Sequence, residues 1–215
     1  MVSLGIIIDV ILHVDKYLNM LIQTYHLWVY AILFLVIFLE TGLVLTPFLP
    51  GDSLLFTAGS FAGLGILNIG WLFGLLTLAA IAGDSMNYLI GYYLGPKVFK
   101  SNHSYLFNKE YLERTKEFYA KHGKKAVVLG RFAPIIRTFV PFVAGIGKMS
   151  YKDFIRFNVL GAILWAGIML FAGFFFGTIP IVQNNFSIAL YIIIFLSFLP
   201  MILEIIKARK TTSSK

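Results

Sequence analysis

Four charged residues lie within apolar sequence, each close to a proline or glycine that breaks a helix. Glu40 and Asp52 lie on either side of the sequence TPFLPG, and Arg131 and Arg137 bracket FAPII. A carboxylate in apolar surroundings can hold or release a proton near neutral pH, or bind a cation or a lipid amine. The planar guanidinium group of arginine suits a phosphate, because it donates two parallel hydrogen bonds. These residue types predict a site that handles protons and phosphate groups.

The composition around these charges is that of an integral membrane protein. Of the 215 residues, 59% are hydrophobic, which exceeds the share in ordinary soluble domains. A charge at membrane depth is costly and usually marks a pathway, and irregular backbone there is tolerated only inside protein or beside a cavity. The combination predicts a transport site. The chain has no cysteine, which excludes disulfides and thiolate chemistry.

The same charged residues also admit structural roles. Asp52 follows a Pro-Gly pair and suits the N-cap of a helix that begins at Ser53. The charges of the two acids and the two arginines balance, so Glu40 could form a buried ion pair with either Arg131 or Arg137. The sequence alone does not indicate which arginine it pairs with. Such ion pairs are compatible with transport if substrate replaces them during the cycle.

A second polar group lies on one predicted helix. Asp84, Asn87, Tyr88 and Gly91 fall at positions i, i+3, i+4 and i+7, on one helical face. They suit a polar contact with another helix as well as they suit a functional site. The residues at the helix breaks are also candidates for the phosphate site. A new helix starts after each break, and backbone N–H groups at a helix start favour a phosphate. These supporting residues are Pro50, Gly51, Pro134 and Pro141.

The elements that must position these residues are helices. A spanning helix needs about 20 apolar residues, and the predicted spans are 27–46, 71–95, 157–179 and 186–206. Two further apolar stretches, 47–66 and 126–147, are interrupted by proline and glycine and are predicted to be re-entrant hairpins. Residues 1–26 are predicted to form an amphipathic helix at the membrane interface. Residues 108–122 are predicted to form a surface helix, capped by Asn108 and stopped by Gly123.

Loop charges indicate the orientation. Lys and Arg outnumber Asp and Glu by eight to three in 97–125, by three to one in 148–156 and by four to one in 204–215, whereas 60–70 and 178–187 carry no charge. The positive-inside rule therefore predicts that the three basic segments are cytoplasmic.

This orientation makes the two hairpins enter from opposite faces. Both flanks of 126–147 are cytoplasmic, and 47–66 enters from outside if the N-terminus is also cytoplasmic. Opposed broken hairpins are typical of transporters built from inverted repeats. The predicted fold is an all-α membrane protein with about four spans and two opposed hairpins. Its domains are the amphipathic helix 1–26, a transport domain over 27–206 and a basic tail over 207–215.

Over roughly residues 30–178 the chain resembles the DedA family, also described by its VTT or SNARE-associated domain. The residues that carry the resemblance are Glu40-Thr41-Gly42, Pro50-Gly51-Asp52, Gly83-Asp84, Asn87-Tyr88, Gly91, Gly130-Arg131-Phe132, Pro134, Arg137, Pro141 and Ala144-Gly145. The resemblance implies a lipid transporter of the bacterial inner membrane that depends on the proton gradient. It implies undecaprenyl phosphate or phosphatidylethanolamine as substrate, with scramblases among eukaryotic relatives. It also implies functional roles for Glu40, Asp52, Arg131 and Arg137.

Other functions compete with this expectation. A proton- or cation-coupled small-ion transporter would use the same carboxylates without a phosphate site. A lipid phosphatase is not expected, because Phe132 stands where that motif needs proline after Arg131 and no histidine follows Lys124. A structural assembly factor would not explain charge in both hairpins. We expect no enzymatic activity, metal, cofactor or nucleic-acid partner; protons and a lipid are the expected partners, and homo-oligomerisation stays open.

Overall fold

The computed structural model describes residues 14–25, 27–43, 51–98, 109–133, 136–180 and 182, and within these ranges all regular structure is helical, as predicted. Several predictions lie outside the described residues: Pro50, Pro134, the cap at Asn108, the span 186–206 and the tail 207–215.

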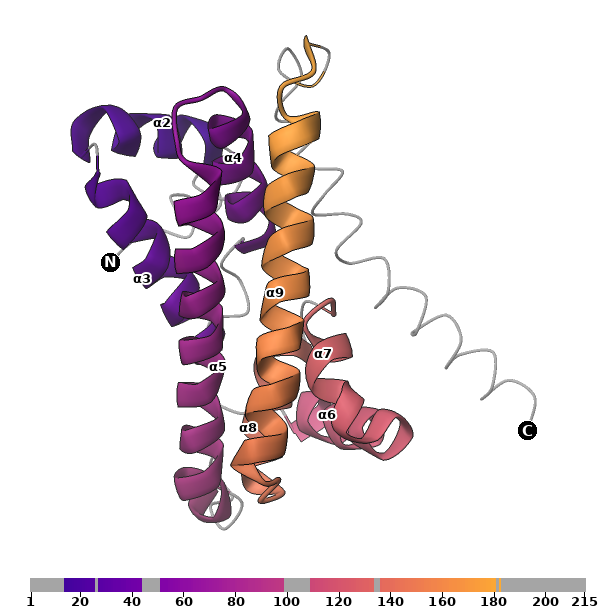
Figure 1. The fold of residues 1–215 in the computed structure, drawn as a ribbon. Helices are drawn as coiled ribbons and strands as arrows, with labels where there is room; N and C mark the ends of the chain where they lie inside the picture. Colours follow the sequence, from indigo (N-terminus) through magenta and orange to yellow (C-terminus); the bar gives the residue numbers. More distant parts are fainter. Residues whose placement is uncertain are drawn as a thin grey trace.

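Two long helices, α5 (Ile69–Val98) and α9 (Tyr151–Phe176), run antiparallel through the centre of the molecule (Figure 1). Each contains 26 residues, Ile69–Leu94 and Tyr151–Phe176, that are long and apolar enough to cross a membrane. At 1.5 Å per residue such a helix is about 39 Å long, which exceeds the ~30 Å of the hydrocarbon core. The predicted spans 71–95 and 157–179 are therefore helical, although both helices begin earlier than the apolar patterns do.

The start of α9 corrects one loop prediction. Residues 148–156 were expected to be a cytoplasmic loop, but the helix already begins at Tyr151. Lys152 and Arg156 are good helix formers, so the helix continues through charged sequence beyond its apolar part.

The first short-helix pair is α3 (Trp28–Gly42) and α4 (Gly51–Gly63). The predicted span 27–46 is shorter than expected, because α3 ends at Gly42 and Leu43 is extended. Glycine is a poor helix former, which accounts for the early end. The predicted N-cap at Asp52 is wrong, because α4 begins at Gly51 and Asp52 lies in its first turn. There its negative charge interacts favourably with the positive end of the helix dipole.

The second pair is α7 (Ala126–Gly130) and α8 (Ile136–Ile146). The Val140 side chain lies against Gly130, so the chain reverses direction between the two helices. This agrees with a broken helical hairpin over 126–147. The break lies at 131–135, and α8 continues through Pro141.

Two further helices lie at the periphery. The amphipathic α2 (Val14–Tyr25) buries Leu18, and α6 (Lys109–His122) forms the predicted surface helix. It is followed by the 3-10 turn η1 (Gly123–Lys125), where Gly123 has a φ of 56°, the left-handed conformation that ends helices. The Tyr119 hydroxyl donates to the Val140 carbonyl at 3.0 Å and fixes α6 against α8.

One short helix of each pair packs on the long helix of the other half: α4 packs on α9, and α8 packs on α5. In the α4–α9 pair, Gly59 and Gly173 each lie against backbone carbonyl groups of the partner helix. Gly145 and Gly91 make the equivalent contacts in the α8–α5 pair. Figure 1 shows α4 beside the upper part of α9 and α7 beside its lower part.

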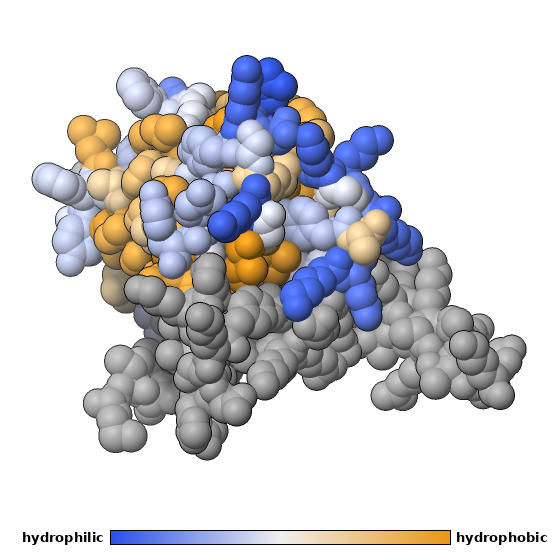
Figure 2. All heavy atoms as spheres, turned by 90° about the horizontal axis from the view of Figure 1, so that it is seen from below, coloured by the Kyte–Doolittle hydropathy of each residue, from blue (hydrophilic) through white to orange (hydrophobic). Residues whose placement is uncertain are grey.

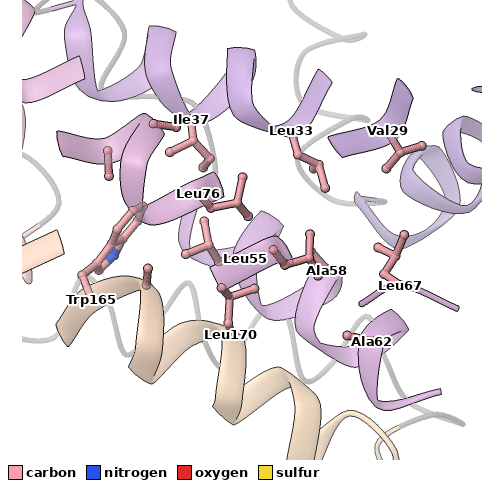
Figure 3. Packing of buried hydrophobic residues seen from close by; sticks show 14 of the residues in the cluster. Val29, Leu33, Ile37, Leu55, Ala58, Ala62, Leu67, Leu76, Trp165 and Leu170 are labelled. Carbon is pink, nitrogen blue, oxygen red and sulfur yellow. The ribbon is translucent and has the colours of Figure 1, made fainter. Parts of the chain in front are cut away.

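Helices α3, α4, α5 and α9 share the main apolar core. Figure 3 shows Leu33, Leu55, Leu76 and Leu170, one from each helix, all at most 1% exposed. Large apolar side chains also lie on the outside of both long helices. They include Trp71, Leu78, Ile168 and Phe175, as expected of surfaces that face lipid.

The two ends of the long-helix pair differ in charge. We call one of them the basic end; it carries Lys121, Lys124, Lys125, Lys148 and Lys152. Hydrophilic side chains gather on this end in Figure 2. The turns at the other end, 64–68 and 177–180, carry no charge. That the basic end faces the cytoplasm stays a prediction of the positive-inside rule.

Candidate functional site

Arg137 links the two breaks in the helical structure. It lies in the first turn of α8 and forms ion pairs with Glu40, near the end of α3, and with Asp52, at 2.8 Å. Glu40 is completely buried and also accepts the N–H of Gly51 at 3.3 Å. The structure therefore answers the open pairing: Glu40 pairs with Arg137.

Arg131 belongs to a separate ion pair. It follows α7 directly and pairs with Asp84 of α5. The same guanidinium donates to Asn158 Oδ1 of α9 at 2.5 Å and to the Ala80 carbonyl at 3.2 Å. Gly161 leaves space for its stem, since a Cβ there would lie 3.1 Å from Arg131 Cδ. Arg131 thus joins the α7–α8 hairpin to both long helices.

Trp165 stands between the two ion pairs. Its Nε1 donates to Asp52 Oδ1 at 2.8 Å, and the guanidinium carbons of Arg131 and Arg137 lie 6.0 and 5.5 Å from its ring. Cations at this distance from an indole face are attracted by its π electrons. Sequence reasoning missed both Trp165 and Asn158. Their i, i+7 spacing places the two on one face of α9, a signal that was available.

The polar face of α5 meets different partners along its length. Asn87 is fully buried and donates to the Thr41 carbonyl at 3.2 Å and to the Thr138 carbonyl at 2.8 Å, so it ties α3 to α8. The Tyr88 hydroxyl donates to the Met149 carbonyl at 2.5 Å. Asp84 alone among these three lines the cavity between the ion pairs.

That cavity is small. Its walls are Thr41, Asp84, Arg131, Arg137, Thr138 and Trp165. It has room for about one water molecule. A phosphate group therefore does not fit while the ion pairs are closed, and any such ligand must displace carboxylate oxygens.

The buried charges do not balance. Three carboxylates (Glu40, Asp52, Asp84) face two guanidinium groups, which leaves 2 − 3 = −1 when all are ionised. An uncompensated buried charge costs several kcal/mol, by an order-of-magnitude estimate. Glu40 Oε2 is also buried without a partner among the described residues. Both facts favour one bound proton in the group. Within the same described ranges, no three acidic or histidine side chains gather as metal ligands would.

Comparison with known proteins gives the family. Residues 49–175 match the model of the VTT domain. The chain is 51% identical to Protein DedA of Escherichia coli K12 over 209 residues, which cover 96% of this chain and 95% of that protein. The chain belongs to the DedA family.

Other DedA-family relatives are membrane proteins by name. An uncharacterized membrane protein of Mycobacterium leprae is 42% identical over 168 residues, covering 78% of this chain and 75% of its own length. The inner membrane protein YqjA of Escherichia coli K12 is 34% identical over 152 residues, covering 71% and 69%. No solved structure matches the chain. The resemblance found in the sequence is confirmed, and the chain is a membrane protein.

Replacing Trp165 with phenylalanine tests its role between the ion pairs. Trp165→Phe keeps an aromatic ring but removes the hydrogen bond to Asp52. A bond to a charged group contributes about 1.5–3 kcal/mol, so we expect a melting temperature lower by several degrees. Trp71→Phe is the control, because Trp71 is 67% exposed. Equal effects in both variants would contradict a specific role for Trp165.

Proposed function

We propose that this DedA-family protein moves a phosphate-bearing lipid across the plasma membrane in exchange with protons, with undecaprenyl phosphate as the leading candidate. One observation carries the proposal: the Arg137 guanidinium is held by carboxylates of the opposite half, Glu40 and Asp52, deep among apolar helices. Phosphate oxygens match carboxylate oxygens in geometry and charge, so a phosphate headgroup can replace these acids on Arg137.

The surroundings of Arg137 support an anionic headgroup. Arg137 lies in the first turn of α8, where the positive end of the helix dipole favours anions. The indole of Trp165 lies beside the guanidinium and restricts its orientation. Arg131, across the same cavity, adds a second positive charge.

Proton coupling follows from the charge imbalance. A phosphate that enters while the carboxylates around Arg137 are ionised would be repelled by them. Protonation of Glu40 and Asp52 removes two negative charges and frees the donors of Arg137. Phosphate entry and carboxylate protonation are therefore linked, and a proton gradient would drive lipid movement.

The two halves of the fold support alternating access. The acids Glu40 and Asp52 flank the break of the first half, and both arginines flank the break of the second. The Arg137 ion pairs thus tie one half to the other, and their opening would let the halves move. In this proposal 47–66 and 126–147 are re-entrant hairpins and both termini are cytoplasmic.

The direct test uses purified protein in liposomes with a pH gradient. Leaflet exchange of undecaprenyl phosphate and of phosphatidylethanolamine is measured in the wild type and in Arg137→Ala. Arg156→Ala is the control variant, because Arg156 is exposed near the basic end. Gradient-dependent exchange of the polyprenyl phosphate supports the proposal. Exchange of phosphatidylethanolamine alone would replace the substrate, and ion flux without lipid exchange would favour the small-ion transporter.

The acidic residues allow a separate prediction. In Glu40→Gln the side chain keeps its shape but cannot exchange a proton, so lipid exchange is expected to lose its acceleration by the pH gradient. The measurement compares exchange rates with and without the gradient in wild type and variant. Glu117→Gln, in the peripheral helix α6, is the matched control. A gradient response that survives in Glu40→Gln would exclude Glu40 as a coupling residue.

A further inference from the structure

A row of polar side chains lies where the two long apolar helices face each other. Asp84 and Ser85 belong to α5, and Tyr151 and Asn158 belong to α9. We call these four residues the polar seam. Polar groups are expensive in a membrane span and usually mark a function, but the ion pairs of the proposed site account only for Asp84.

The polar seam is continuous with the buried ion pairs. Asn158 Oδ1 accepts from Arg131, the partner of Asp84, at 2.5 Å. Its Nδ2 donates to the Ile81 carbonyl at 3.1 Å and lies 3.5 Å from Ser85 Oγ. The Tyr151 hydroxyl lies 3.3 Å from the same Ser85 oxygen. One polar line therefore runs from Asp84 to Tyr151.

The polar seam also opens toward the basic end. Exposure rises along it: Asp84 is 4% exposed, Ser85 is half-buried and Tyr151 is 46% exposed. Ser85 Oγ donates to the Ile81 carbonyl at 2.7 Å, whereas its contacts with Asn158 and Tyr151 are longer, at 3.5 and 3.3 Å. These two contacts lie at the long end of the hydrogen-bond range and are therefore weak, so they can open to admit water.

We propose that the polar seam is a proton path between the basic end and Asp84, and that Asp84 is a second proton-exchanging carboxylate of the transporter. The inference rests on the proposed function, because it adds a proton-exchanging group to that site. With the predicted orientation, this path joins the site to the cytoplasm.

The transfer itself is simple. A proton from water in the polar seam binds a carboxylate oxygen of Asp84, where an O–H bond forms, and the reverse step returns it to water. Arg131 keeps its own proton and charge but loses its ionic partner. Asn158 and the two hydroxyl groups hold the water, and their protonation does not change.

The charged and titratable groups around Asp84 come from four elements. Arg131 follows α7 and is its direct partner, and Arg137 of α8 faces it across the cavity. Glu40 of α3 and Tyr119 of α6 are close enough to interact electrostatically with Asp84. A proton on Asp84 therefore changes the field at both arginines, which links the polar seam to the Arg137 site.

The first experiment labels single cysteines, since the natural chain has none. Ser85→Cys is expected to react with a small hydrophilic, membrane-impermeant thiol reagent added at the basic end of protein in liposomes. Thr77→Cys, on the same helix and 8% exposed, is the control and is expected to stay unreactive. An unreactive Ser85→Cys, or equal reaction at both positions, would overturn the path. This measurement needs no lipid substrate, so it stands apart from the outcome of the lipid assay.

The second experiment separates proton exchange from a purely structural ion pair. Asp84→Asn is expected to lose the gradient response, so that its rate of lipid exchange is the same with and without a pH gradient. Asp84→Glu, which keeps a carboxylate, is expected to retain that response. A surviving gradient response in Asp84→Asn would refute the inference. The inference would also be refuted if Asp84→Asn and Asp84→Glu lost exchange to the same extent with and without the gradient and both had a lowered melting temperature. That result would show that the ion pair between Asp84 and Arg131 is purely structural.

Discussion

Replacing Arg137 with alanine is expected to abolish lipid exchange in liposomes. The substitution removes the guanidinium that both Glu40 and Asp52 bind and that we propose as the phosphate ligand. Each hydrogen bond to a charged group contributes about 1.5–3 kcal/mol, and every 1.36 kcal/mol corresponds to a tenfold change in rate. The loss of two such bonds predicts a decrease of at least ~100-fold. Arg137→Lys keeps the charge without the planar fork and is expected to lose at least ~10-fold.

Loss of folding must be separated from loss of function in this experiment. Arg137→Ala leaves two carboxylates without their partner, which for a buried pair costs about 3–5 kcal/mol of stability. The triple variant Arg137→Met, Glu40→Gln, Asp52→Asn removes the charges together and is expected to regain a near-native melting temperature while remaining inactive. Recovery of transport in the triple variant would show that Arg137 serves the fold and binds no phosphate.

Replacing Gly91 with alanine is expected to lower the melting temperature of the detergent-solubilised protein by about 2–12 °C. The added Cβ would clash with the Phe142 carbonyl, which belongs to the backbone of α8 and cannot move aside. Overpacking of this kind costs about 1–3 kcal/mol, and for a chain of this size each kcal/mol shifts the melting temperature by about 2–4 °C. Thermal unfolding followed by circular dichroism measures the effect.

The fold supplies both a control and a symmetry test for this prediction. Gly74 lies on the same helix with no atom near its Cβ position, so Gly74→Ala is expected to be neutral or slightly stabilising. Gly173→Ala introduces the equivalent clash with the Phe56 carbonyl in the other half. It is expected to destabilise as much as Gly91→Ala. Unequal effects would show that the two halves are not equivalent in packing.

The reciprocal packing gives the charges their arrangement. Acids from the first half meet an arginine from the second, so the attraction acts between the halves and not within one of them. Asp84 and Asn158 then add a contact from each long helix to Arg131. The fold thus gathers three carboxylates and two guanidinium groups around one small cavity.

Local features of the fold were readable from the sequence. The apolar runs predicted helices at α5 and α9, and the prolines and glycines predicted the break between α7 and α8. The helix boundaries were predicted less well. Charged residues extend α9 to Tyr151, and a glycine shortens α3 at Gly42, because ends depend on single residues whose preferences are weak.

The sequence by itself determined that this is a helical membrane protein with charges beside helix breaks, because composition and periodicity are local properties. It also carried the motifs of the DedA family. Only the tertiary structure decided that Glu40 meets Arg137, 97 residues away, while Arg131 meets Asp84. Only the packing of α9 brought Trp165 to the cavity and Asn158 to Arg131. From the sequence alone, the two acids and two arginines could pair in several ways of similar local energy. The close packing of α4 on α9 and of α8 on α5, at their glycines, decides which charges meet.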